Sequence, residues 1–588
     1  MMKDHDVKER AVNLLVRIFD SYLSEFLIIT RRAKTSFAEQ DWKGGRRDAA
    51  ERLSVYEKVL AQVSIQMEGI LGESAHDRST WIGLKPLFAR LIAGRRNKDI
   101  AETFFNSVTR KMLRTVGIDR EVEFFYLHAK RRTKTPQSQI YRKYEQQQKT
   151  KDLLRKIVAD HPFNAVYEDL ERDLESVANE VDLFLWPVVR GNEHCVMEIL
   201  APCFYRNKVA YIVGRIVTGS QLFPIIIPLS NDASGLHIDS VLMQQADADN
   251  IFGFAYSYFQ VDIDTPGELV DFLSSILPQK PLSDLYNAIG FYKHGKTEFY
   301  RDLHRVVHVS KEQFVIAPGM EGAVMVVFTL PNYHHVFKVI KDKPCFLRSS
   351  HTTDKILDKD EVKYRYRFVC NRDRVGRLVD TQEFENVRFK TKRYSKELLH
   401  EFELAAQEGV TVRDGYVVIR HLYLQRKVTP LPMYFQEEKS ANAIRQVVID
   451  FGYFIKDLAS TGLFPGDLFN TWNYGVTAGN RVVLFDYDDV MPLEDAQFKQ
   501  KPGPMGEYEE MNPEEEWIVA QPTDFFLDEM DSFVGIPHAL RGIFNAEHKD
   551  LFTVQFWQTM KKRVSDGELI DIIPYDRTKR FRRSTREA

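Results

Sequence analysis

The chain has 588 residues, of which 44% are hydrophobic and 12% aromatic, and this composition excludes a disordered protein. The length exceeds what one ordinary hydrophobic core holds, so we expect at least two large domains. Lysine and arginine total 81 against 84 aspartate and glutamate, and this net charge of −3 argues against a nucleic-acid partner.

Cysteine usage and the short apolar segments predict a cytoplasmic protein with no membrane partner. The first residues contain no apolar leader, and the most apolar stretch, 223–229, is far too short to cross a bilayer. No cysteine belongs to a CxxC pair or has zinc-like spacing, which is typical of free thiols in a reducing compartment. The four cysteines are Cys195, Cys203, Cys345 and Cys370.

The first half of the chain reads as mostly helical with a small sheet. Val12, Leu15 and Phe19 begin a series of apolar residues at helical spacing near the start. From about 193 to 230, β-branched and aromatic residues predict strands, and 266–305 returns to helix. We expect residues 1–310 to form one α-rich domain that carries a small sheet.

The second half begins with a strand, a turn and a strand from about 311. A charged helical stretch to about 378 and further strand-like sequence to about 428 follow. After Pro430 and Pro432 the chain reads as helical, apart from the candidate site 467–488, which includes a short strand at 481–485. The expected fold class is therefore α+β, with residues 311–588 forming a small β-rich lobe and a larger α lobe, the bilobal plan of protein kinases.

A glycine-bearing loop and a lysine are candidates for binding phosphate. Gly319 and Gly322 would let backbone N–H groups approach phosphate oxygens, although two glycines between strands more often mark a simple hairpin. Lys338 lies on the strand after this hairpin, where a kinase lysine pairs with phosphates, and Lys341 is the alternative. The loop comprises Ala317, Pro318, Gly319, Met320, Glu321, Gly322 and Ala323.

The acceptor and metal residues of a kinase have candidates further along the chain. Asp467 would take the proton of the acceptor hydroxyl, while Asn473 and Asp486 would hold Mg²⁺. Asn470 is an alternative metal ligand, or a turn residue, and Asp488 would contact a second metal or cap a turn. The order of these motifs is that of a protein kinase, although no His-Arg pair precedes Asp467 and Asn473 follows it by six residues instead of five.

Several stretches resemble the bacterial isocitrate dehydrogenase kinase/phosphatase family, and the likeness covers nearly the whole chain. Among them are FYRNKVAYIVGRIV (204–217), APGMEGAVMVVFTLP (317–331), VFKVIKD (336–342), DRVGRLVDTQEFEN (373–386), FPGD (464–467) and FDYD (485–488). The run 373–386 is the most specific of these.

The resemblance implies an enzyme that uses ATP and Mg²⁺ to phosphorylate a serine of isocitrate dehydrogenase, which it also dephosphorylates at the same ATP/ADP site. This activity would divide carbon between the Krebs cycle and the glyoxylate bypass. It further implies that the N-terminal domain responds to AMP, and that the segment 540–572 helps to grip the folded dehydrogenase dimer. From the sequence alone, Phe552, Phe556 and Trp557 in that segment could equally be ordinary core.

By the same resemblance, loop 317–323 and Lys338 bind ATP, and Asp467, Asn473 and Asp486 correspond to the catalytic-loop and metal residues. The choice between Asn470 and Asn473 stays open. Asp380, which opens DTQEFEN, corresponds to an active-site proton acceptor of the family, whereas its own sequence context would suit a charged turn. We expect Asp467 to act as the base of the kinase step.

No separate phosphatase motif is visible, since Arg377 lies one residue too far from Cys370 for a thiolate loop and no His/Asp cluster suggests a dinuclear metal centre. Dephosphorylation is therefore expected in the nucleotide pocket, with Asp380, Asp467 or Asp488 orienting water. Two other functions remain possible at this point: a kinase of a different substrate, and a nucleotide sensor with little catalysis.

Overall fold

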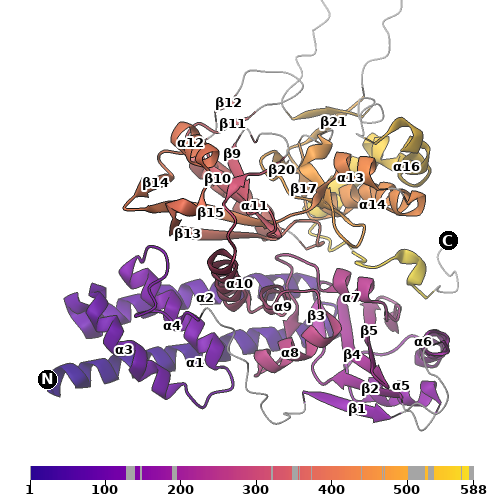
Figure 1. Cartoon of the computed structure of the whole chain (residues 1–588). Coiled ribbons are helices and arrows are strands. Elements are labelled where there is room, and N and C mark those ends of the chain that lie inside the picture. Colours follow the sequence, from indigo (N-terminus) through magenta and orange to yellow (C-terminus); the bar gives the residue numbers. More distant parts are fainter. Residues whose placement is uncertain are drawn as a thin grey trace, which may run out of the picture. The chain divides into compact units, whose positions relative to one another are not determined.

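A computed structural model describes the greater part of the chain, in two compact units. The first unit comprises Met1–Gly253, Ser257–Lys311 and Ile573–Ala588, and the second comprises Phe254–Tyr256 and Glu312–Ile572 (Figure 1). Among the described residues, no helix combines the length and the apolar character needed to cross a membrane. The described residues are 2–126, 140–145, 149–187, 195–318, 322, 324–346, 355–356, 358–372, 374–438, 440–466, 468, 470–500, 523–527, 536–570 and 572–581.

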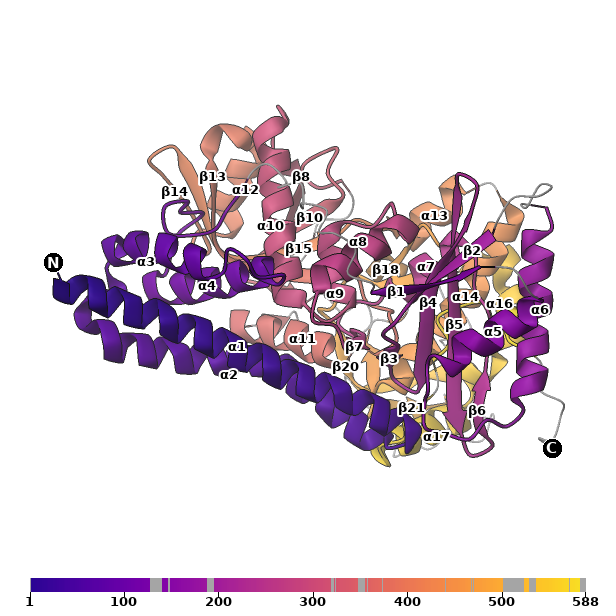
Figure 2. The ribbon, with the colours of Figure 1, turned by 90° about the horizontal axis from the view of Figure 1, so that it is seen from below.

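Two long helices begin the first unit and lie side by side (Figure 2). Leu15, Phe19 and Phe26 are buried in their shared core, as their helical spacing predicts. Asp41 caps the second of these helices by accepting a hydrogen bond from the Gly44 N–H. The helices of this unit are α1 (Met2–Ala38), α2 (Trp42–Leu71), α3 (Arg78–Leu91), α4 (Lys98–Leu113), α5 (Thr150–Ala159), α6 (Leu170–Leu185), α7 (Gln245–Ile251), α8 (Pro266–Ile276), α9 (Leu282–Ala288) and α10 (Tyr292–Val309).

The sheet of the first unit is antiparallel and is built around its long strand β4. One edge of β4 pairs with β2 and then β3, while β5 runs along the other edge. The predicted strands between 193 and 230 are confirmed. The strands are β1 (Tyr141–Glu145), β2 (Cys195–Leu200), β3 (Phe204–Arg206), β4 (Val209–Thr218), β5 (Gln221–Asp232), β6 (Gly235–Ile238) and β7 (Gln260–Val261).

A late segment of the chain, 573–581, returns to this first unit. Tyr575 donates a hydrogen bond to Asp239, and Arg580 forms a bidentate ion pair with the same carboxylate, with nitrogen–oxygen distances of 2.7 and 2.9 Å. Lys579 pairs with Asp247 at 2.6 Å. Because Asp239 and Asp247 are only 4% and 6% exposed, this segment neutralises two buried carboxylates of the first unit.

The second unit begins with a six-stranded antiparallel sheet of order β13-β15-β10-β9-β8, with β14 beside β15. Helix α12 interrupts the stretch that was expected to be strand-like, because Ser395 caps it and Leu398 and Phe402 bury one face. The elements are β8 (Val315–Ile316), β9 (Met325–Thr329), β10 (His335–Ile340), β11 (Cys345–Phe346), β12 (Lys355–Ile356), α11 (Lys359–Arg372), β13 (Thr381–Lys390), α12 (Lys396–Ala405), β14 (Val410–Arg413) and β15 (Tyr416–Arg426).

The remainder of this unit packs around α14, whose apolar face is buried. The fold class is thus confirmed: an α-rich half with a small sheet precedes a half with a β-rich part and a helical part. The elements are β16 (Thr429–Pro430), α13 (Leu431–Glu437), α14 (Ala441–Ser460), β17 (Leu463–Pro465), β18 (Tyr474–Val476), β19 (Val482–Leu484), β20 (Val490–Pro492), β21 (Gln497–Lys499), β22 (Asp524–Phe526), α16 (Arg541–His548) and α17 (Val554–Ser565).

Arg377 ties the segment before β13 to α14 and β19. Its guanidinium donates to both oxygens of Asp450, at 2.6 and 2.8 Å, and to Asp457 at 2.8 Å. Asp450 also accepts the Val482 N–H at 2.6 Å. Since Asp450 and Asp457 are two helical turns apart on α14, one arginine fixes both the helix and the strand that lead into the candidate site.

Candidate active site

The predicted phosphate loop lies at the turn of the β8–β9 hairpin. Ile316 pairs with Phe328, and the Ala317 N–H donates to the Val327 carbonyl at 3.0 Å. A Cβ on Gly322 would lie 2.7 Å from the Met325 carbonyl oxygen, so any larger residue would force this loop to move. Pro318 is also described, whereas Gly319, Met320, Glu321 and Ala323 lie outside the described residues.

The Lys338 side chain points from the sheet toward the segment 485–488, which carries Asp486 and Asp488. It occupies the middle of β10, between Val327 on β9 and Tyr423 on β15, and it is 6% exposed. Its Nζ donates to the Phe485 carbonyl at 3.0 Å, directly before Asp486. The alternative, Lys341, instead lies 4.0 Å from Glu401. The geometry therefore favours Lys338 as the lysine of this site.

A short hairpin brings Asn473 and Asp486 together. Asn473 immediately precedes β18 and Asp486 follows β19, and the Asn473 carbonyl accepts the N–H groups of Phe485 and Asp486 at 3.1 and 3.4 Å. The Asn470 side chain instead accepts the Trp472 N–H at 3.3 Å, which is a local turn contact. The arrangement favours Asn473 over Asn470 beside Asp486. Asp467 lies outside the described residues.

Asp380 reaches the same place along a neighbouring extended segment. Leu378 and Leu484 form a parallel bridge, in which the Val379 N–H donates to the Leu484 carbonyl at 3.0 Å. Asp380 and Asp486 each lie two residues after this isolated bridge, which joins the two segments that carry them. The Gln382 amide donates to both carboxylate oxygens of Asp380, at 3.0 and 2.8 Å.

The electrostatics around Asp488 suit a cation. Burial and then the charge of Asp486 raise the pKa of Asp488 well above its usual range, while Lys338 acts in the opposite direction. One carboxylate oxygen of Asp488, Oδ1, is buried with no hydrogen-bond partner. Carboxylate and amide oxygens are the ligands that Mg²⁺ prefers, so the donor set of Asn473, Asp486 and Asp488 fits this ion.

Three further residues, which motif spacing alone did not single out, organise the site. The Gln425 amide donates to the Phe485 carbonyl at 2.8 Å and to the Thr381 hydroxyl at 3.0 Å. Arg365 on α11 donates to the Asp488 carbonyl, and Tyr487 donates to the Val379 carbonyl. Strand register brings Gln425 to the site and helix α11 brings Arg365, whereas Tyr487 lies within the motif FDYD itself.

The register of β13 and β15 also gathers Glu383, Glu385 and His421, whose possible ligand atoms lie within 4.8 Å of one another. Glu383 lies 3.3 Å from His421 and 3.6 Å from Arg367, so its charge is compensated within the protein. Arg367 is the cation beside this cluster, since burial lowers the pKa of His421.

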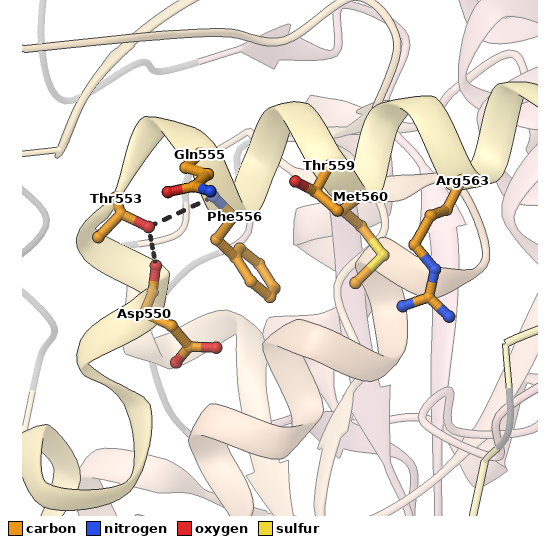
Figure 3. A pocket seen from close by; sticks show the side chains of 7 residues that line it. All are labelled: Asp550, Thr553, Gln555, Phe556, Thr559, Met560 and Arg563. Atoms are coloured by element: carbon orange, nitrogen blue, oxygen red, sulfur yellow. Dashed lines mark hydrogen bonds between the residues drawn. The ribbon is translucent and has the colours of Figure 1, made fainter. Parts of the chain in front are cut away.

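A separate pocket lies beside α17 in the second unit and has a volume of about 280 Å³. Figure 3 shows Phe556, Met560 and Arg563 on one side of this helix. Lys456 lies 2.7 Å from Asp550 at the same place. Trp557 is fully buried and stacks on Phe498, so it belongs to the core, whereas Phe556 lines the pocket. The pocket is lined by Asp550, Thr553, Gln555, Phe556, Thr559, Met560 and Arg563.

Comparison with known proteins gives matches over nearly the whole chain. The family described as "Isocitrate dehydrogenase kinase/phosphatase (AceK), regulatory domain" matches residues 12–311, and the family described as "Isocitrate dehydrogenase kinase/phosphatase (AceK) kinase domain" matches residues 312–577. A protein of Anaeromyxobacter sp. (strain Fw109-5) is 38% identical over 99% of both chains. Proteins of Anaeromyxobacter dehalogenans (38%, 96% of both chains) and Polaromonas sp. (35%, 96% of this chain and 92% of the relative) are also similar. All three are named isocitrate dehydrogenase kinase/phosphatase.

Proposed function

This chain belongs to the isocitrate dehydrogenase kinase/phosphatase family, and on that basis we propose that one site in its second unit performs both reactions. The chain phosphorylates isocitrate dehydrogenase with ATP and removes the same phosphate, which places it at the branch between the Krebs cycle and the glyoxylate bypass. The observation that carries a shared site is the convergence of Lys338, Asn473 and Asp380 on the segment 484–488.

In the kinase step, loop 317–323 and Lys338 hold the phosphates of ATP. Asp467 accepts the proton of a substrate serine as its oxygen forms a bond to the γ-phosphorus, and the bond from that phosphorus to the β-phosphate oxygen breaks to release ADP. Lys338 supports this role because it is buried and its ammonium group is aimed at the loop that carries Asp486.

Asn473 and Asp486 would hold Mg²⁺, with Asp488 completing the oxygen ligands. When bound, Mg²⁺ would neutralise charge on the phosphate oxygens. The partnerless buried oxygen of Asp488 and the adjacent backbone positions of Asn473 and Asp486 support this assignment.

In the phosphatase step, Asp380 orients a water molecule and accepts one of its protons. The water oxygen forms a bond to the phosphorus of phosphoserine, the bond from phosphorus to the serine oxygen breaks, and that oxygen takes up a proton while inorganic phosphate leaves. The bridge between Leu378 and Leu484 supports this role, since it brings the segment that carries Asp380 to the segment that carries Asp486.

Residues 1–310 would act as the regulatory domain, with AMP as an effector that favours dephosphorylation, and residues 311–588 as the catalytic domain. The pocket on α17 would help to grip the folded isocitrate dehydrogenase dimer. Its mixture of apolar and charged side chains, Phe556, Asp550 and Arg563, suits a protein surface. Phe556→Ala should then raise KM for isocitrate dehydrogenase while leaving KM for ATP unchanged.

The direct test follows label from γ-labelled ATP onto purified isocitrate dehydrogenase, and then adds ADP and AMP. The shared site requires label to appear and leave while dehydrogenase activity falls and recovers in step. Asn473→Ala and Asp486→Ala should abolish both directions, whereas Asn470→Ala should retain both. A variant of Asp486 that loses only one direction would contradict the shared site.

A further inference from the structure

Three residues of the first half of the chain, Phe254, Ala255 and Tyr256, belong to the second unit. The chain leaves the first unit after Gly253 and re-enters it at Ser257. Tyr256 adopts a φ of +57°, a left-handed conformation that is uncommon for a bulky residue. We call this segment the 254–256 insert. Such a strained conformation persists only where surrounding contacts hold it, so these contacts are informative.

The insert contacts the Asp380-bearing segment at both ends. A Cβ on Gly376, whose φ is +64°, would lie 2.6 Å from the Phe254 ring, so the ring lies directly on the glycine. At the other end, the Thr381 N–H donates to the Tyr256 hydroxyl at 2.6 Å, and that hydroxyl donates to the Thr381 carbonyl at 2.9 Å. The insert therefore contacts both ends of the segment 376–381.

Asp380 lies between two residues whose backbone groups form hydrogen bonds with tyrosine hydroxyls. Tyr487, between the metal-site aspartates, donates to the Val379 carbonyl, and Tyr256 binds the backbone N–H and the backbone carbonyl of Thr381. Burial raises the pKa of the Tyr256 phenol well above its usual value, so the hydroxyl keeps its proton and continues to donate. The carboxylate itself is oriented by Gln382. The Val379 side of Asp380 is thus tied to the metal-site segment through Tyr487, and the Thr381 side is tied to the insert through Tyr256.

We propose that Tyr256 is a positioning residue for dephosphorylation, which sets Asp380 through the peptide groups of Thr381. The inference rests on the water-orienting role assigned to Asp380 above. Because Lys338, Asn473 and Asp486 are held by other contacts, the Tyr256 hydroxyl affects phosphorylation much less. The insert is continuous in sequence with the first unit on both sides.

The test compares Tyr256→Phe with the wild type in both directions on isocitrate dehydrogenase. Phenylalanine keeps the buried ring and removes only the hydroxyl, so both hydrogen bonds to Thr381 are lost. We expect kcat for dephosphorylation to fall about tenfold, with KM for the phosphorylated dehydrogenase unchanged and phosphorylation within about twofold of wild type. The melting temperature should stay close to that of the wild type.

Tyr258→Phe is the matched control, because Tyr258 stacks on Tyr292 in the first unit and should change neither reaction. Asp380→Asn and the double variant that combines it with Tyr256→Phe complete a double-mutant cycle. If Tyr256 acts through Asp380, the double variant dephosphorylates no more slowly than Asp380→Asn alone.

Equal losses of phosphorylation and dephosphorylation in Tyr256→Phe would overturn the proposal and mark the hydroxyl as a structural group. Unchanged dephosphorylation in Tyr256→Phe, with Asp380→Asn inactive, would overturn the positioning role and leave the role of Asp380 intact. Full dephosphorylation by Asp380→Asn would overturn both roles.

Discussion

Lys338 and Lys341 are three residues apart, yet their surroundings give them different tasks. Lys338 is buried and bonded to the Phe485 carbonyl, whereas Lys341 lies near Glu401. A buried ammonium whose hydrogen bond goes to a neutral carbonyl oxygen gains a stronger partner when a phosphate binds. Lys338 is thus placed to bind the phosphates of the ligand, whereas the charge of Lys341 lies near that of Glu401.

Lys338→Met should therefore reduce phosphoryl transfer to isocitrate dehydrogenase by about 100-fold or more, because it removes a positioned cation while keeping an apolar stem of similar size. The measurement is the initial rate of label transfer from ATP. Lys341→Met is the matched control and should stay close to wild type. Equal effects of the two substitutions would contradict the assignment.

Asp450 makes the stability of the second unit sensitive to acid. Burial acts to raise its pKa, but the Arg377 guanidinium outweighs this and holds the pKa of Asp450 below its ordinary value. A carboxyl whose pKa is lower in the folded state stabilises the fold above its unfolded pKa of about 3.9. That stabilisation is lost as the pH falls through the lower, folded pKa.

Asp450→Asn should accordingly weaken the dependence of unfolding on pH below about pH 4, although it also lowers stability at neutral pH. Thermal unfolding of the wild type and the variant at several values between pH 3 and pH 7 measures this. Parallel curves for the two proteins over that range would show that Asp450 contributes nothing to the acid transition.

At the scale of elements, the close packing of α14 against α16 depends on one glycine. A Cβ on Gly452 would lie 2.1 Å from the ring of His548, a fully buried side chain whose Nε2 donates to the Ile449 carbonyl at 2.8 Å. No rotation of a ring held in this way makes room for a methyl group. The glycine on α14 is therefore what lets the two helices approach.

Gly452→Ala should lower the free energy of unfolding by about 1–3 kcal/mol, in spite of the better helix propensity of alanine. Gly542→Ala on α16 is the control, since a Cβ at that position would have no atom within 4 Å, and it should stabilise the helix by about 0.5–1 kcal/mol. Chemical denaturation of both variants measures the difference. A stabilised Gly452→Ala protein would refute the packing argument.

The elements also show which features the sequence could predict. Local periodicity was sufficient for α1 and for the strands β2 to β5, because the apolar residues of each recur within a few positions. Helix α12 was missed because the strands on both sides of it dominate the pattern. Motif order predicted Lys338, Asn473 and Asp486, whereas the contacts of Gln425 and Tyr256 depend on tertiary pairing over long separations.

At the scale of the whole molecule, the return of residues 573–581 makes the first unit discontinuous in sequence. Deleting the chain after Ile572 would leave the buried carboxylates of Asp239 and Asp247 without Arg580 and Lys579. Losing one partner of a buried ion pair costs about 3–5 kcal/mol. The effect of such a deletion therefore falls on the first unit, although the deleted residues follow the kinase motifs in sequence.

The truncated protein should show a lower melting temperature for the first unit, and faster proteolysis within residues 1–311, than the full chain. Truncation after Phe581 is the control, because it keeps Tyr575, Lys579 and Arg580. A first unit that melts equally in both truncated proteins would show that the returning segment contributes no stability.

The same returning segment affects the order in which the two units complete their folding during translation. A chain emerges from the ribosome at about 5–20 residues per second, and its earlier domains usually fold first. Here most of the first unit is translated early. Its residues Tyr575, Lys579 and Arg580 are added only after the entire second unit has been synthesised. For roughly 17 to 68 s, the nascent chain contains the carboxylates of Asp239 and Asp247 without their cationic partners. Because the last residues of the first unit are added only after the second unit has been synthesised, a ribosome that stalls inside residues 312–572 leaves neither unit finished.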